Sequence, residues 1–296
     1  MPAMRLSVFL LPAATAWKIF AATIPPAADP FWAKRYAQKG RNLNQADYLE
    51  WQQELLTHLT DPRPFNVLKG LVRVPENMLK LVLNRMCFEG LVLRLGAHSM
   101  RSNSISYVAS TDWSVSKQKI DPEQALCWLA GEYLAAFGPA RVRDFQWWAG
   151  VGALRAKAAF AANETIDIGD GLLLLKNNAS EFETFTASTT DTVDILPQWD
   201  CYIMGYAPDG RSRFASPDTL DKIYGKLGAT GGNASGVILI NGLAIGTWQY
   251  RFTGKKIIVT TSMFETLTAG VRQAIAEQFG HIVQVLGAEK LELNYT

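Results

Sequence analysis

Cysteine and histidine are scarce in this chain of 296 residues, which contains three of each. Cys87, Cys127 and Cys201 are far apart in the sequence, and each lies in an apolar run. A disulfide framework needs an even set of cysteines, and a zinc site needs cysteine or histidine pairs at short spacing. We therefore expect no metal site and no cofactor. Unpaired cysteines of this kind are typical of a reducing, cytoplasmic compartment.

Long hydrophobic runs are also missing. A membrane-spanning helix needs roughly 20 consecutive apolar residues, and no stretch of the sequence approaches that length. The apolar N-terminal run after Arg5 is interrupted by Lys18 and lacks the small-residue cleavage site of a signal peptide. We expect a buried strand over residues 6–11, followed by a helix, and no membrane partner.

Charge is modest and unevenly distributed. Only 19% of the residues are charged, and the formal net charge is +2. Residues 63–101 hold seven basic and two acidic residues, a balance of +5, whereas residues 177–296 hold nine basic and twelve acidic residues, a balance of −3. A polyanion would be attracted to the middle section. The alternative is that these cations only form the solvated faces of helices.

The middle of the chain begins with a segment of three expected helices and a hairpin. Asn44 can cap a helix over 45–59, whose apolar residues recur with helical spacing. A proline-rich break and a short helix follow, and then a longer helix over 76–89. Two β-rich runs at 91–95 and 105–109 would form the hairpin. This order is typical of a winged helix.

A second segment repeats the same order. One helix ends at Phe137, a Gly-Pro break precedes a helix that ends at Ala149, and a third helix runs over 153–162. Two short apolar runs joined by Gly169-Asp170-Gly171 complete the hairpin. Two copies of one order of elements indicate a tandem repeat of one fold unit.

The C-terminal section is rich in β-strand signals. Runs at 237–240, 243–250 and 256–261 are separated by turn residues and predict three antiparallel strands, onto which a helix over 267–286 would pack. We therefore expect an α+β fold with tandem winged-helix (helix-turn-helix) units and a C-terminal antiparallel β-sheet domain. The expected domains are 1–42, 43–119, 120–176 and 177–296.

The third helix of a helix-turn-helix unit fits the DNA major groove, and flanking cations contact phosphates. Asparagine and arginine side chains could also read bases, whereas lysines would contact only the backbone. Winged helices also serve as protein–protein modules, which is the alternative. We predict a DNA-binding surface formed by Asn77, Lys80, Asn84, Arg85, Arg94, Arg101, Arg141, Arg143, Arg155 and Lys157.

Three separated stretches then resemble one family. These are GEYLAAFGPARVRDFQWWAGV (131–151), LPQWDCYIMGY (196–206) and GVILINGLAIGTWQYRFTGKKIIV (236–259). They are similar to signatures of the winged-helix DNA-binding family that includes bacterial alkylpurine and interstrand-crosslink repair DNA glycosylases. The resemblance implies a bacterial, cytoplasmic protein with tandem winged helices that binds double-stranded DNA, including damaged DNA.

The resemblance also implies a missing part. In those glycosylases, catalysis is attributed to a Gln-x-Gln or Gln-x-Asp motif in an additional winged-helix unit that precedes the two present here. Residues 1–42 look like the remnant of that unit, so we expect a DNA-binding protein without the catalytic segment, and its catalytic residues are unknown. Two alternatives stay open: an active glycosylase, for instance one whose start codon is wrongly assigned, and a winged-helix transcription regulator.

Some polar residues could be mistaken for catalytic residues. Gln198-Trp199-Asp200 spells Gln-x-Asp, but we interpret Trp199 as a core residue and Asp200 as an acceptor in a turn. Asp112, Asp144 and Asp170 have no obvious partner nearby in the sequence, and Asp144 is expected to cap or salt-bridge its helix.

Overall fold

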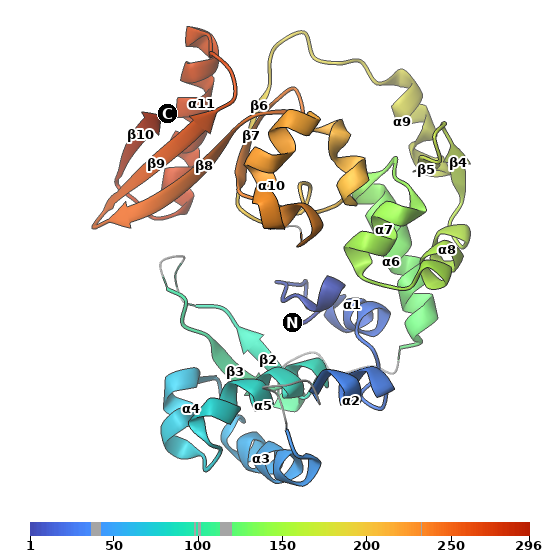
Figure 1. Ribbon diagram of the computed structural model, residues 1–296, viewed down its shortest axis with the longest axis vertical. Helices are drawn as coiled ribbons and strands as arrows, with labels where there is room; N and C mark the ends of the chain where they lie inside the picture. The colour runs from blue at the N-terminus through green and yellow to red at the C-terminus, as the bar shows by residue number, and fades with distance from the viewer. Residues whose placement is uncertain (37–42, 98, 100–101, 113–119, 232) are drawn as a thin grey trace. The chain divides into compact units, whose positions relative to one another are not determined.

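The computed structural model describes residues 1–36, 43–97, 99, 102–112, 120–231 and 233–296 (Figure 1). The chain has a mixed α+β fold and consists of two compact units. The first comprises Met1–Glu132 and Ala149–Asn163, and the second comprises Tyr133–Trp148 and Glu164–Thr296. Helix α6 (Pro122–Phe137) contributes to both units.

Helices make up most of the first unit. The sequence correctly placed helix α3, and Asn44 caps it as predicted, because the Asn44 side chain accepts a hydrogen bond from the Ala46 N–H at 2.8 Å. The long helix predicted over 76–89 is also confirmed. The helices of this unit, besides its part of α6, are α1 (Ala16–Thr23), α2 (Pro30–Tyr36), α3 (Gln45–His58), α4 (Phe65–Leu71), α5 (Glu76–Phe88) and α8 (Ala153–Ala161).

A small antiparallel sheet completes the middle of this unit. Strands β2 (Val92–Leu95) and β3 (Ser106–Ala109) form the predicted hairpin, and β1 (Arg63–Pro64) pairs with the other edge of β3. Helix α5 belongs to the same core as β2, because its Leu79, Leu83 and Met86 side chains are fully buried in one cluster with Val92. Burying one face of α5 in this way leaves its opposite face to solvent.

The strand predicted over residues 6–11 is wrong. Residues Met4–Leu6 form a 3₁₀ turn, and only a single bridge joins Pro2 to Val8. Val8 and Leu10 are 50% and 101% exposed, so the apolar run does not supply a buried strand. Helix α1, which follows it, does bury its apolar side chains.

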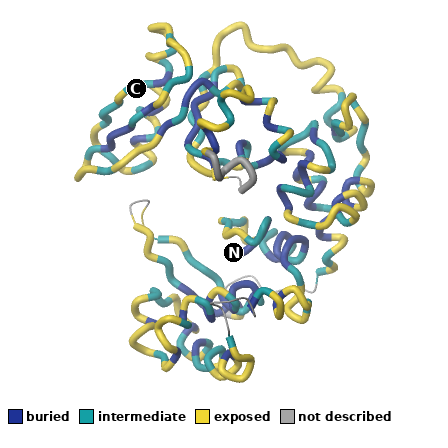
Figure 2. The backbone as a smooth tube through the Cα atoms, in the orientation of Figure 1, coloured by how far each residue is buried: buried dark blue, intermediate teal, exposed yellow. Residues whose placement is uncertain are grey.

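The second unit begins with a helix and a small hairpin. The sequence correctly predicted its first helix, α7 (Val142–Ala149), whose residues up to Trp148 belong to this unit. It also correctly predicted the hairpin of strands β4 (Thr165–Asp167) and β5 (Leu173–Leu175). Residues 180–192 are exposed throughout (Figure 2). The turn η3 (Lys176–Asn178) and helix α9 (Ala179–Thr184) come before the large sheet, and the turn η4 (Pro208–Arg213) and helix α10 (Pro217–Gly231) lie between its first and second strands.

The C-terminal sheet is mixed, which corrects the prediction of a purely antiparallel one. Its strand order is β10-β9-β8-β7-β6, and β10 pairs with β9 in parallel. Helix α11 (Ala269–Val285) covers it, and Ile275 and Phe279 are fully buried in its core. The strands are β6 (Val193–Leu196), β7 (Gly236–Ile240), β8 (Leu243–Thr253), β9 (Lys256–Met263) and β10 (Lys290–Tyr295).

Candidate nucleic-acid interface

Helix α5 presents three polar side chains to solvent. Asn77, Lys80 and Asn84 are all exposed, and they are spaced three and four residues apart. This spacing places them along one face of the helix. The helix therefore offers one cation and two amides on the side opposite to its buried leucines.

Lys80 and Arg94 line the same hollow. This hollow has a volume of about 290 Å³, and the other residues that line it are Phe65, Asn66, Asn103, Ser104, Ile105 and Tyr107. The Arg94 guanidinium lies 6.0 Å from the centre of the Tyr107 ring. Ammonium, guanidinium, amide and hydroxyl groups are all donors to phosphate oxygens. The hollow therefore has the chemistry of a phosphate contact.

The charge of this hollow comes from its two cations. Burial raises the pKa of the Tyr107 hydroxyl, and the neighbouring Arg94 charge opposes that rise only in part. Tyr107 is therefore neutral at physiological pH and does not offset the positive charge of Lys80 and Arg94.

Arg85, which the sequence placed on the exposed face of α5, is largely enclosed. Its Nε donates to Glu89 Oε1 at 2.9 Å and its Nη2 donates to Gln45 Oε1 at 2.8 Å. The guanidinium stacks 3.7 Å from the centre of the Tyr48 ring, and the Arg85 side chain is only 13% exposed. These contacts tie α5 to α3, and a role of Arg85 in DNA binding stays a prediction.

Tyr48, on which Arg85 stacks, forms a cluster of polar contacts with Arg85 and Glu89. Tyr48 donates its hydroxyl to Glu89, and Gln52 Nε2 donates to the Tyr48 hydroxyl at 3.1 Å. Burial and the hydrogen bond to Glu89 hold the pKa of Tyr48 well above its usual range. The cluster is a structural connection between helices α3 and α5.

The cations predicted on α8 are both at the surface. Arg155 Nε donates to Glu123 Oε1 at 2.8 Å, and both side chains are well exposed. Lys157 is exposed. Arg101 lies outside the described residues. The predicted DNA-binding role of these three residues is untested.

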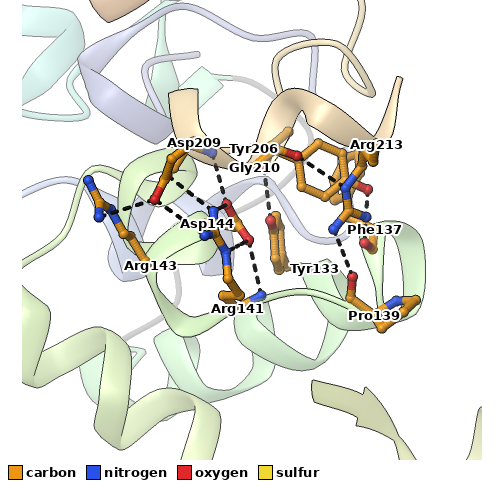
Figure 3. A network of polar contacts seen from close by, with 12 residues as sticks. Tyr133, Phe137, Pro139, Arg141, Arg143, Asp144, Tyr206, Asp209, Gly210 and Arg213 are labelled. Carbon is orange, nitrogen blue, oxygen red and sulfur yellow. Dashed lines mark hydrogen bonds and ion pairs between the residues drawn. The ribbon is translucent and has the colours of Figure 1, made fainter. Parts of the chain in front are cut away.

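Arg141 and Arg143 lie in a network of carboxylates at the start of α7 (Figure 3). Asp144 is fully buried, and it accepts from Arg141 Nε at 3.0 Å and from the Ala207 N–H at 3.1 Å. Asp209 lies 3.1 Å from both Arg141 Nη2 and Arg143 Nη1. Asp144 thus forms the salt bridge predicted for it.

This network shifts the pKa values of its members. The hydrogen bond to Asp144 holds the pKa of Arg141 above its usual range, although burial opposes the shift. Burial would raise the pKa of Asp209, but the hydrogen bond and the charge of Arg141 outweigh it and lower that pKa. Arg141 is therefore committed to a structural ion pair, whereas the Arg143 side chain is 70% exposed.

Further bonds in Figure 3 join the stretch before α7 to residues 205–213. The Tyr133 hydroxyl donates to the Gly205 carbonyl at 2.8 Å, and the Tyr206 hydroxyl donates to the Phe137 carbonyl at 2.9 Å. Arg213 Nη2 donates to the Pro139 carbonyl at 3.1 Å. Two of the stretches that carried the family resemblance, 131–151 and 196–206, are thus bonded to each other.

The stretch Gln198-Trp199-Asp200, which spells Gln-x-Asp, has an unexpected geometry. Asp200 is a turn acceptor, as predicted, because its Oδ1 accepts from the Tyr202 N–H at 2.8 Å. The interpretation of Trp199 as a core residue is wrong, because its side chain is 61% exposed. Its backbone φ of 62° also places it in the left-handed region.

The described part of the chain contains no group of three or more histidine, cysteine, aspartate or glutamate side chains that could hold a metal ion. Within the same residues, every helix is too short or too polar to cross a bilayer.

Comparisons with known proteins connect this geometry to one family. A family model described as DNA glycosylase AlkZ-like matches residues 1–284. The solved structure of the Streptomyces sahachiroi DNA glycosylase AlkZ matches with a TM-score of 0.71 and 17% sequence identity, over 100% of this chain and 81% of that chain. At that identity the likeness shows a shared fold. Among curated proteins, no match was found.

Proposed function

The chain belongs to the DNA glycosylase AlkZ-like family, and on this premise we propose that it binds double-stranded DNA, including DNA with damaged bases. The observation that carries the proposal is the convergence of Lys80 and Arg94 on one hollow beside the exposed polar face of α5. Neutralisation of backbone phosphates by cations supplies most of the non-specific affinity of a protein for DNA.

We propose that residues 43–119 act as a winged-helix unit on the DNA. The order of α3, β1, α4, α5, β2 and β3 supports this assignment, because α5 then takes the place of the helix that enters the major groove. In this proposal Lys80 and Arg94 contact phosphates, whereas Asn77 and Asn84 face base edges. The order of α6, α7, α8, β4 and β5 supports the same assignment for residues 120–176.

The test is the affinity of a Lys80→Gln/Arg94→Gln double variant for a fluorescent duplex, measured by anisotropy across a salt titration. Each lost phosphate contact should lower the slope of log affinity against log salt by about 0.9. We therefore expect weaker binding with a flatter salt dependence.

A matched control is the Lys222→Gln/Lys290→Gln double variant, which removes two exposed lysines from the section with net charge −3. It changes the net charge by the same amount and should bind as the parent does. If both double variants retain the parental affinity and slope, the proposed surface is wrong.

A second candidate function is removal of alkylated or crosslinked bases, which family membership favours. Cleavage of the glycosidic bond needs a side chain that positions water and stabilises charge, together with access to an extruded base. Asp144 does not fit that role, because it is fully buried and bonded to Arg141 and the Ala207 N–H. Incubating the purified protein with methylated and crosslinked duplexes, and scoring retention and base release separately, distinguishes binding from catalysis.

A further inference from the structure

Trp199 combines two unfavourable features at one residue. Its large side chain is 61% exposed, although the apolar surface of a tryptophan is normally buried. Its backbone φ of 62° lies in the left-handed region, which is costly for a bulky residue. Exposed aromatic side chains on strained backbone are a feature of binding sites rather than of cores.

Hydrogen bonds fix the Trp199 ring in this exposed position. The indole Nε1–H donates to Asn233 Oδ1 at 2.6 Å. On the backbone side, the Asp200 N–H donates to the Pro197 carbonyl at 3.2 Å, and Asp200 Oδ1 closes the next turn by accepting from the Tyr202 N–H at 2.8 Å. The indole N–H thus has an acceptor, and the residue is nevertheless 61% exposed.

We propose that Trp199 is a stacking residue for an unstacked nucleobase of DNA. This inference rests on the proposed DNA binding. Base–aromatic stacking needs one open ring and does not depend on the identity of the base. Proteins that act on or inspect single bases read them after the base has left the duplex stack.

The surroundings of Trp199 favour a base over a protein partner. The flanking Gln198 and the hydrogen-bonded Asn233 are polar and exposed, whereas a protein interface is built around a contiguous apolar patch. Residues 177–296 carry a balance of −3, so this section does not attract phosphates, and the proposed contact is to the face of a base and not to the DNA backbone.

The test compares three fluorescent DNAs: an intact duplex, the same duplex with one bulged adenine, and the unpaired strand. We expect Trp199→Ala to lose about tenfold in affinity for the bulged duplex and the single strand, the effect of one lost stacking contact. Binding to the intact duplex should be unchanged. Trp199→Phe, which keeps an aromatic ring, should retain most of the affinity for the bulged duplex.

Phe185→Ala is the matched control, because Phe185 is a 76% exposed aromatic residue of the same unit outside this turn. It should bind all three DNAs as the parent does. Parental affinity of Trp199→Ala for the bulged duplex would overturn the inference and would leave protein docking as the use of this ring. If the parent binds none of the three DNAs, the proposed function itself fails.

Discussion

The fully buried carboxylate of Asp144 lies 2.9 Å from Nη2 of Arg141, three residues earlier in the chain. Asp144 also accepts from the Ala207 N–H, and breaking a buried ion pair typically costs 3–5 kcal/mol. We expect Asp144→Asn to lower the free energy of unfolding by about 3 kcal/mol, measured by urea denaturation. Asp209→Asn is the control, because Asp209 is 42% exposed and an exposed pair contributes under about 1 kcal/mol. Equal losses in both variants would contradict this account.

The lowered pKa of Asp209 predicts how stability depends on pH. A carboxyl whose pKa is lower in the folded state contributes stability that is fully present above its unfolded pKa. Because the ordinary value is 3.8 and the folded value lies below it, this contribution is lost as the pH falls through the acid range. Parent and Asp209→Asn stabilities should therefore differ at neutral pH and converge in acid. A constant difference from neutral to acid pH would show that the Asp209 pKa is not lowered.

Gly210 is required by a close approach of two side chains. A Cβ at this position would lie 2.6 Å from Asp144 Oδ1 and 2.8 Å from Arg141 Nη2. We expect Gly210→Ala to lower the free energy of unfolding by roughly 1–3 kcal/mol, the usual cost of overpacking. The control is Gly280→Ala in the interior of α11, where a Cβ meets nothing within 4 Å. That change should instead stabilise the protein by about 0.5–1 kcal/mol, and an equal loss at both positions would refute the packing argument.

Replacing Arg85 should affect the stability of the protein more than its affinity for DNA. Its ion pair with Glu89 and its stacking on Tyr48 predict that Arg85→Gln costs about 2 kcal/mol of stability, the scale of a hydrogen bond to a charged group. The loss of DNA affinity should be smaller than that of Lys80→Gln. Anisotropy at a temperature where both variants are folded provides the comparison, and a larger affinity loss for Arg85→Gln than for Lys80→Gln would show that Arg85 contributes directly to DNA binding.

Much of the helical framework could be predicted because local patterns determine it. The helical spacing of apolar residues and the Asn44 cap were sufficient to place α3 and α5. The enclosure of Arg85 was not foreseen although a local signal existed, since Glu89 follows it by four residues, the spacing of a helical ion pair. The parallel pairing of β10 with β9 joins Lys290 to Lys256 across the whole of α11, and no local pattern specifies such a partner.

Trp199 shows a different limit of sequence reasoning. An aromatic residue in an apolar stretch is usually buried, and hydrophobic character alone does not reveal a turn that holds the ring outward. The exposure of Trp199 depends on its φ of 62° and on a hydrogen bond to Asn233, 34 residues away. Both are properties of the folded chain.

The chain first passes from one compact unit to the other between Glu132 and Tyr133, which lies inside helix α6. The chain passes again after Trp148 and after Asn163. No single cut can therefore separate the two units with both of them intact, because at each crossing at least one of the two fragments lacks a segment of its own unit. Limited proteolysis should consequently leave fragments that stay associated until denaturant is added.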